Sequence, residues 1–145
     1  MIYDEIIKIE EIGIEETIDI SVDGNNLFFA NDILTHNSGS EKTAQESSMS
    51  DTSDCLYPLS LVDHKTKGKI FLKDLIVGDE ILGKNGYVQV QRVFEPKLKR
   101  AYKIKMKSGQ EIICSADHDF PVNGDRNRIK KIKIGLKQGE ILMVK

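Results

Sequence analysis

The tripeptide His36-Asn37-Ser38 carries three side chains that together can cut a protein backbone. The side-chain amide of Asn37 can attack its own backbone carbonyl, His36 can move protons, and Ser38 offers a hydroxyl nucleophile. Cys55, which follows a polar stretch, adds a thiol, a stronger nucleophile at neutral pH. Alone, the tripeptide is typical of a turn or a helix cap. Together with Cys55 it is suited to cutting and rejoining a backbone.

Three longer motifs lie around these residues, at residues 17–35, 76–82 and 109–121. The first resembles the C-terminal motif of inteins, which are self-splicing protein insertions, and the second resembles the intein N-terminal block. The third is similar to the second intein block, whose core is Thr or Ser, two residues and then His. Ser115 and His118 match that core. The likeness is to compact phage-type split inteins.

The order of the motifs is the inverse of that in an ordinary intein, where the Cys block comes first and the His-Asn block last. The resemblance therefore identifies residues 1–37 as an intein C-terminal piece and residues 55–145 as an N-terminal piece, which form one folded domain. Residues 38–54 are rich in Ser, Thr, Glu and Asp without apolar periodicity, so we interpret them as extein or engineered linker. This layout predicts a permuted single-chain mini-intein without a homing endonuclease.

The resemblance also implies roles in the first step of splicing. Cys55 would attack the carbonyl of Asp54 and convert that amide into a thioester. Ser115 would hold the scissile peptide, and His118 would protonate the departing nitrogen. Asp19 matches an acidic residue that approaches the N-terminal cysteine in the family, where it would pass protons between the two nucleophiles. The other interpretation of Asp19 is a solvent-facing carboxylate on an alternating strand.

Further roles follow for the later steps. Ser38 would take the acyl group from the thioester, and Asn37 would then cyclise to a succinimide and cut its bond to Ser38, with His36 as proton donor. The product would be a head-to-tail ring of residues 38–54, formed in one turnover with no cofactor and no metal. Asn26 stands where many inteins carry a His, which leaves the base for Asn37 cyclisation open.

Composition agrees with a small self-contained domain. The 145 residues, 39% of them hydrophobic, suffice for one compact core. No apolar run approaches the roughly 18 residues that span a bilayer, and the N-terminus is acidic, so we expect a soluble, cytoplasmic protein. Two cysteines without a Cys-x-x-Cys pair favour neither a disulfide framework nor a zinc site. Cys114, in an apolar run, is interpreted as a small buried hydrophobe.

Charge is divided unequally along the chain. Residues 1–37 hold nine acidic residues and one lysine, a net charge of −8, whereas residues 55–145 hold nineteen Lys and Arg against ten acidic residues, a net charge of +9. Opposite charges steer association. We therefore expect the two pieces to bind each other within the chain, with the extein segment as their own substrate and neither nucleic acid nor membrane as a partner.

The hydrophobic pattern predicts mostly strands. Apolar and polar residues alternate over residues 18–23 and 102–107, which is the period of a half-buried strand. Turn-forming residues lie between such runs, at residues 23–25, 84–86, 108–109 and 123–125. The most helix-like candidate is short, around residues 71–75. The pattern alone predicts a small β-barrel or sandwich, and the resemblance implies an all-β, compact Hedgehog/intein fold with pseudo-two-fold symmetry and little helix.

Two other functions stay open. The chain could be a splicing-silent permuted scaffold in which residues 38–54 merely tie two halves together. It could instead be a small basic β module that binds nucleic acid through its surplus of Lys and Arg. Aromatic residues make up only 6% and are not interleaved with the basic ones, as base stacking would require. Self-splicing is the function that we expect.

Overall fold

The computed structural model describes residues 2–37 and 55–145 and consists almost entirely of strands. The strands are β1 (Ile2–Thr17), β2 (Ile20–Val22), β3 (Leu27–Ala30), β4 (Ile33–His36), β5 (Leu61–His64), β6 (Gly68–Phe71), β7 (Glu80–Gly83), β8 (Gly86–Val93), β9 (Lys97–Met106), β10 (Glu111–Ser115), β11 (Phe120–Pro121), β12 (Ile129–Lys130) and β13 (Ile141–Val144). A short 3-10 helix, η1 (Leu72–Asp74), follows β6. Ser38 and Asp54, both part of the predicted chemistry, lie outside the described residues.

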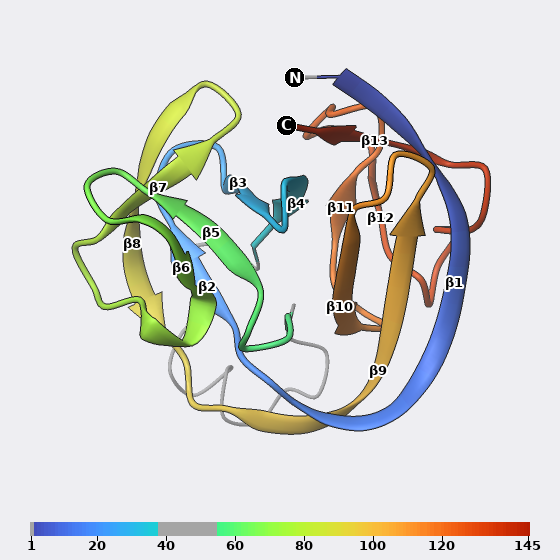
Figure 1. Cartoon of the computed structure of the whole chain (residues 1–145), viewed down its shortest axis with the longest axis horizontal. Coiled ribbons are helices and arrows are strands. Elements are labelled where there is room, and N and C mark those ends of the chain that lie inside the picture. Colours follow the sequence, from blue (N-terminus) through green and yellow to red (C-terminus); the bar gives the residue numbers. More distant parts are fainter. Residues whose placement is uncertain (1, 38–54) are drawn as a thin grey trace.

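Two antiparallel sheets contain most of the strands. The strand order is β10-β9-β1-β13-β4-β3 in the first sheet and β2-β8-β7-β5-β6 in the second, while β11 and β12 form a small pair. In Figure 1 the second sheet lies on the left and β9, β10 and β13 lie on the right, with β3 and β4 between them. Each large sheet takes strands from residues 1–37 and from residues 55–145. The two segments are therefore interleaved.

The long strands β1 and β9 pair over most of their length and curve together around one side of the molecule (Figure 1). Two register shifts interrupt this pairing, and Gly13 lies directly after the second, with a positive φ of 97°. Such a backbone conformation favours glycine, and register irregularities of this kind bend and twist a strand. Bending lets β1 leave β13 at its start and follow β9 toward the second sheet.

One hydrophobic core joins the two sheets. Its buried side chains come from both segments of the chain and include Ile6, Ile20, Phe28, Val90, Ile104, Phe120 and Leu142. A smaller cluster consists of Leu27, Phe29, Leu34 and Met143. Burial of apolar surface is the main favourable term in folding. Since both clusters need side chains from both segments, neither segment can bury its apolar face alone.

A tight turn at Asn31 and Asp32 joins β3 to β4 and sets the position of β4. Both residues have positive φ, 50° and 64°, as a two-residue hairpin turn requires. The side chain of Asn31 donates to the carbonyl of Glu111 at 2.8 Å and accepts from the amide of Leu61 at 2.7 Å. The turn is thereby fixed to β10 and β5, and β4 runs from it to His36.

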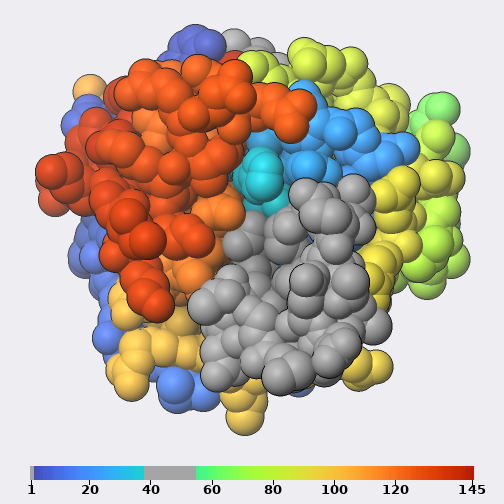
Figure 2. Space-filling model, turned by 180° about the vertical axis from the view of Figure 1, so that it is seen from behind, coloured from blue at the N-terminus to red at the C-terminus, as the bar shows by residue number. Residues whose placement is uncertain are grey.

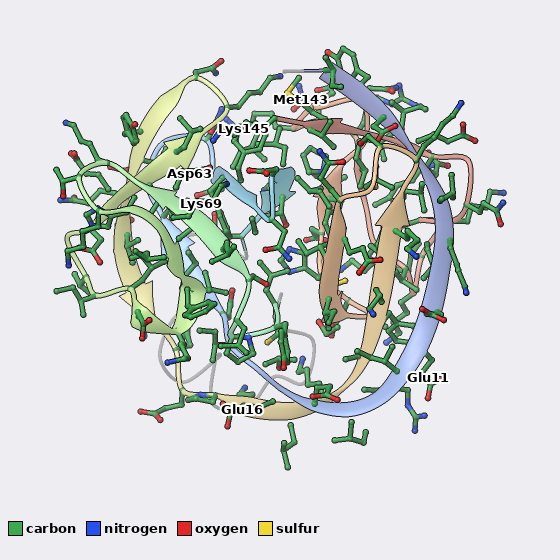
Figure 3. The ribbon with its side chains drawn as sticks, viewed as in Figure 1. Glu11, Glu16, Asp63, Lys69, Met143 and Lys145 are labelled. Atoms are coloured by element: carbon green, nitrogen blue, oxygen red, sulfur yellow. The ribbon has the colours of Figure 1, made fainter. Side chains whose placement is uncertain are left out.

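Ion pairs hold the same turn from outside. Lys69 Nζ lies 2.7 Å from Asp32 Oδ1 and 3.1 Å from Asp63 Oδ1, and Lys145 Nζ lies 3.1 Å from Asp63 Oδ1. Figure 3 shows Asp63 and Lys69 beside β5, with Lys145 close to them. Exposed ion pairs contribute little individually, but this group connects the β3–β4 turn to β5, β6 and the last residue described.

His64, to which the sequence assigns no role, holds the turn after β5. Its Nδ1 accepts the backbone N–H groups of Thr66 and Lys67, each at 3.1 Å. Its Nε2 lies 3.1 Å from Asp79 Oδ1. Nδ1 is thus held by the backbone of the hairpin and Nε2 faces a carboxylate, so His64 acts in the fold of this hairpin.

The prediction of a nearly all-β fold is confirmed, and the short helical candidate corresponds to η1. The alternating pattern of residues 102–107 is also confirmed, because Ile104 and Met106 are buried while Lys105 and Lys107 are exposed. Among residues 2–37 and 55–145, no helix has the length and apolar character needed to cross a membrane.

The half-buried strand predicted for residues 18–23 is wrong on its polar side. Asp19 and Ser21 are only 5% and 0% exposed. The reason is that this segment lies inside the fold, paired with β8 over residues 20–22 and bridged to Leu56 through Ile18. Asp19 is therefore not a solvent-facing carboxylate.

We expect residues 1–37 and 55–145, produced as two polypeptides, to associate more slowly as salt increases. Their net charges of −8 and +9 attract each other, and salt screens this attraction over about 10 Å at 0.1 M. Contacts such as Arg100 Nη1 to Glu11 Oε2, at 2.5 Å, cross between the segments. Stopped-flow mixing at several ionic strengths measures the association rate. A rate independent of salt would show that the charge division plays no part in assembly.

Candidate functional site

The position of Cys55 is fixed by the residue that follows it. Leu56 exchanges backbone hydrogen bonds with Ile18, at 2.9 Å in each direction, and also bridges β10. The carbonyl of Cys55 accepts the amide N–H of Ser115 at 3.0 Å. Cys55 is thus held between the segment that carries Asp19 and the strand that ends at Ser115.

The thiol of Cys55 is buried, with the residue 2% exposed. Burial, and after it the carboxylate of Asp19, raises the pKa of the thiol to about 11, while Lys99 and the hydroxyl of Thr17 act in the opposite direction. The thiolate is the reactive nucleophile. Because the thiol is protonated at neutral pH, its proton must leave during a reaction rather than before it.

Ser115 ends β10, and its hydroxyl donates to Asp117 Oδ1 at 2.8 Å. Asp117 is itself 8% exposed, and its Oδ2 lies 3.6 Å from Lys99 Nζ. An open hollow of about 460 Å³ lies beside this group, lined by Leu98, Lys99, Arg100, Ser115, Ala116, Asp117 and Lys133. Asp117 therefore orients the Ser115 hydroxyl at the wall of this hollow.

His118 lies one turn after Ser115 and is 1% exposed. Its amide donates to the carbonyl of Ser115 at 3.3 Å, and its ring packs edge-on against Phe120 with centroids 4.9 Å apart. Nε2 forms a hydrogen bond with the hydroxyl of Thr35, whereas the buried Nδ1 has no hydrogen-bond partner within the described part of the chain. Burial, and after it the neighbouring His36, lowers the pKa of His118 to about 3. The imidazole is therefore neutral at pH 7.

His36 and Asn37 lie at the end of β4, against the loop that carries His118. The amide of His36 donates to the carbonyl of Asp119 at 3.1 Å, and the amide of Asn37 donates to the carbonyl of Asn26 at 3.0 Å. Asn37 is 1% exposed, while His36 is partly buried. Figure 2 shows the cyan end of β4 at the surface, between the orange residues of the chain's last third and the blue strands.

The structure gathers the predicted site residues that it describes into one region. Cys55 and Ser115 are joined by a backbone hydrogen bond, and the carboxylate of Asp19 acts on the Cys55 thiol. The same loop then brings His118 to the strand of His36 and Asn37. Ser38 lies outside the described residues. Cys114 is 0% exposed in the core, as expected of a small buried hydrophobe.

Sequence reasoning missed three polar residues that contact this set, namely Thr17, Thr35 and Asp117. Spacing gives a signal for each of them. Asp117 lies within the Ser-x-x-His motif. Thr17 and Thr35 stand two residues before Asp19 and Asn37, a separation that places side chains on the same face of a strand.

Comparison with solved structures finds a crystal structure of the gp41-1 intein. The two chains are 29% identical in sequence with a TM-score of 0.53, and the match covers 61% of this chain and 74% of that chain. No family model matches this chain, and no curated protein does. The likeness to gp41-1 confirms both the resemblance to inteins and the all-β fold that this resemblance implied.

We expect His118 to make the protein sensitive to acid. In the unfolded chain its pKa is about 6.5, whereas burial lowers it to about 3 in the fold. The unfolded state therefore binds a proton first, and stability is lost as the pH falls from about 6.5 toward 3, by at most about 1.4 kcal/mol per pH unit.

Urea unfolding of the parent and of His118→Gln at a series of pH values measures this contribution. The free energy of unfolding should fall less steeply with acid in the variant. Parallel pH profiles for the two proteins would show that His118 titrates in the fold as it does in the unfolded chain.

Proposed function

We propose that this chain, whose fold is that of an intein, splices itself: it excises residues 38–54 and joins their two ends. The observation that supports this most is the meeting of two reaction centres in one region. Cys55 and Ser115 lie together at one side, and His118 reaches from the same loop to β4, the strand that ends directly before Asn37.

The first step converts the bond between Asp54 and Cys55 from an amide into a thioester. The neutral His118 takes the thiol proton at Nδ1 and passes it to the amide nitrogen as the C–N bond breaks. With a pKa of about 3, the imidazolium gives that proton up readily. Since the Ser115 hydroxyl donates to Asp117, its oxygen is left to accept the N–H of the scissile amide.

The second step moves the acyl group from sulfur to oxygen. Ser38 attacks the thioester, and Asp19 takes the hydroxyl proton and returns it to the leaving thiolate of Cys55. Asp19 suits this role because it is 5% exposed and acts on the pKa of that thiol. A serine hydroxyl is barely ionised at neutral pH, so this step depends on positioning, which can be worth effective molarities of about 10⁵ to 10⁸ M.

The last step separates the product from the rest of the chain. The side-chain nitrogen of Asn37 attacks its own carbonyl and forms a succinimide, while His36 donates a proton to the nitrogen of Ser38. The ester in the released ring then rearranges to an amide. In the permuted order the product is a ring of 17 residues, 38–54, and residues 1–37 and 55–145 stay associated through their shared sheets.

The mass of the purified protein over time tests this proposal. The precursor should disappear while three species form: residues 1–37 ending in a succinimide, residues 55–145, and the cyclic peptide. Their masses should add up to that of the precursor, because no water is consumed before the succinimide opens. A precursor that stays intact while folded would favour the splicing-silent scaffold instead.

We expect two substitutions to separate the steps. Cys55→Ala should prevent cleavage between Asp54 and Cys55 but leave slow cleavage after Asn37, because succinimide formation uses only local groups. Asn37→Ala should do the reverse and permit thiol-induced cleavage before Cys55. Gel electrophoresis and mass spectrometry identify the fragments. Cleavage before residue 55 in Cys55→Ala at the parent's rate would mean that Cys55 is not the nucleophile.

We expect His118→Ala to slow the first step far more than Cys114→Ala does. A positioned general acid typically contributes about 10²- to 10⁴-fold, whereas loss of the Cys114 thiol from the core costs mainly packing. Dithiothreitol-induced cleavage in an Asn37→Ala background isolates this step, and circular dichroism checks that each variant is folded. The assignment of the Ser-x-x-His motif would be wrong if folded Cys114→Ala lost cleavage while His118→Ala kept it.

A further inference from the structure

The side chain of Thr35 is placed between the two reaction centres. Thr35 belongs to β4, two residues before Asn37, and is 0% exposed. Its hydroxyl forms a hydrogen bond with His118 Nε2 and also lies 3.4 Å from the carbonyl of Asp119. A buried hydroxyl between an imidazole and a carbonyl constrains where the imidazole can carry its proton.

The direction in which the Thr35 hydroxyl donates its proton determines which ring nitrogen of His118 carries a hydrogen. The Thr35 hydroxyl has a single proton. When it donates this proton to the carbonyl of Asp119, its oxygen can only accept, so His118 must carry its proton on Nε2. The Nδ1 of the neutral ring then has a free lone pair, and this buried atom has no hydrogen-bond partner in the described ranges, residues 2–37 and 55–145. If the hydroxyl turned to donate to Nε2 instead, the proton would be on Nδ1.

We propose that Thr35 is a positioning residue that holds His118 in the tautomer with the proton on Nε2 and the lone pair on Nδ1. The inference rests on the proposed function, because that tautomer is the one that can receive the proton of the Cys55 thiol. Thr35 belongs to residues 1–37, whereas His118 belongs to residues 55–145. His118 therefore reaches its reactive form only when β4 is in place.

The protons balance through the step. Nδ1 takes the thiol proton as sulfur bonds to the carbonyl carbon of Asp54, and the resulting imidazolium keeps its Nε2–H on the oxygen of Thr35. As the C–N bond breaks, Nδ1 returns one proton to the amine nitrogen of Cys55. The Nε2–H never leaves, and His118 ends in the tautomer in which it began. Thr35 thus orients the ring without gaining or losing a proton.

Thr35→Val and Thr35→Ser provide the test in the Asn37→Ala background. Valine has nearly the shape of threonine but no hydroxyl, while serine restores the hydroxyl without the methyl group. Ser21→Ala is the matched control, because Ser21 is also 0% exposed and its hydroxyl has no hydrogen-bond partner among the described residues. Dithiothreitol-induced cleavage gives the rate of the first step, and nitrogen-15 shifts of the imidazole report the tautomer directly.

We expect Thr35→Val to slow cleavage about tenfold or more, a part of the 10² to 10⁴ typical of a general acid or base. Thr35→Ser and Ser21→Ala should stay within about threefold of the background protein. The imidazole of His118 should be protonated on Nε2 in the background protein and in Thr35→Ser, and should lose that preference in Thr35→Val. Equal rates in Thr35→Val and Ser21→Ala would overturn the proposal.

The tautomer of His118 in the Asn37→Ala background protein can be measured without any substitution at Thr35. The proposal therefore stays testable if Thr35→Val fails to fold. A proton found on Nδ1 of His118 would contradict it. If the background protein shows no thiol-induced cleavage at all, the proposed splicing function fails. The nitrogen-15 shifts of the background protein and of Thr35→Ser then still decide whether Thr35 sets the tautomer.

Discussion

The reciprocal backbone pairing of Leu56 with Ile18 is the contact on which the rest of the site depends. It places Leu56 between Ile18, which precedes β2, and Cys114 of β10, and the amide of Ser115 donates to the carbonyl of Cys55 at 3.0 Å. Hydrogen bonds in a water-free interior are costly to leave unmade. The backbone at Cys55 is therefore fixed by main-chain hydrogen bonds on both sides.

Burial of this region suppresses charge on both proton-exchanging groups. The same desolvation that raises the pKa of Cys55 to about 11 lowers that of His118 to about 3, since a low-dielectric site disfavours the thiolate and the imidazolium alike. The resting site thus contains neither a strong nucleophile nor a strong acid. In the proposed reaction one proton transfer creates both together, which links thiol activation to departure of the amine.

The sequence was sufficient for the fold class because strand periods and turn residues are local signals, as Ile104 and Met106 illustrate. It failed where burial depends on distant segments. Asp19 alternates like a surface residue, yet it is buried because the residues after it pair with β8 and Ile18, directly before it, is bridged to Leu56. The contact of Thr35 with His118 spans 83 positions, and the spacing of Thr35 two residues before Asn37 shows that they share a face of the chain but not that His118 is the partner. Comparison of β4 with a known family motif identified Asn37 but not the residue two positions earlier.

The interleaved topology makes the site a property of the assembled protein. Within the first sheet β1 lies between β9 and β13, and β4 lies between β13 and β3, so residues 1–37 contribute two interior strands of that sheet as well as its edge strand β3. If these strands were absent, β9 and β13 would lose a hydrogen-bonding neighbour and the core would lose side chains from both clusters. In the proposed reaction β4 holds the hydroxyl of Thr35 against His118, and Asn37 directly follows the last residue of this strand. In that reaction, a displacement of this one strand would disturb thioester formation and succinimide formation together, so both proposed steps would depend on the same folding event.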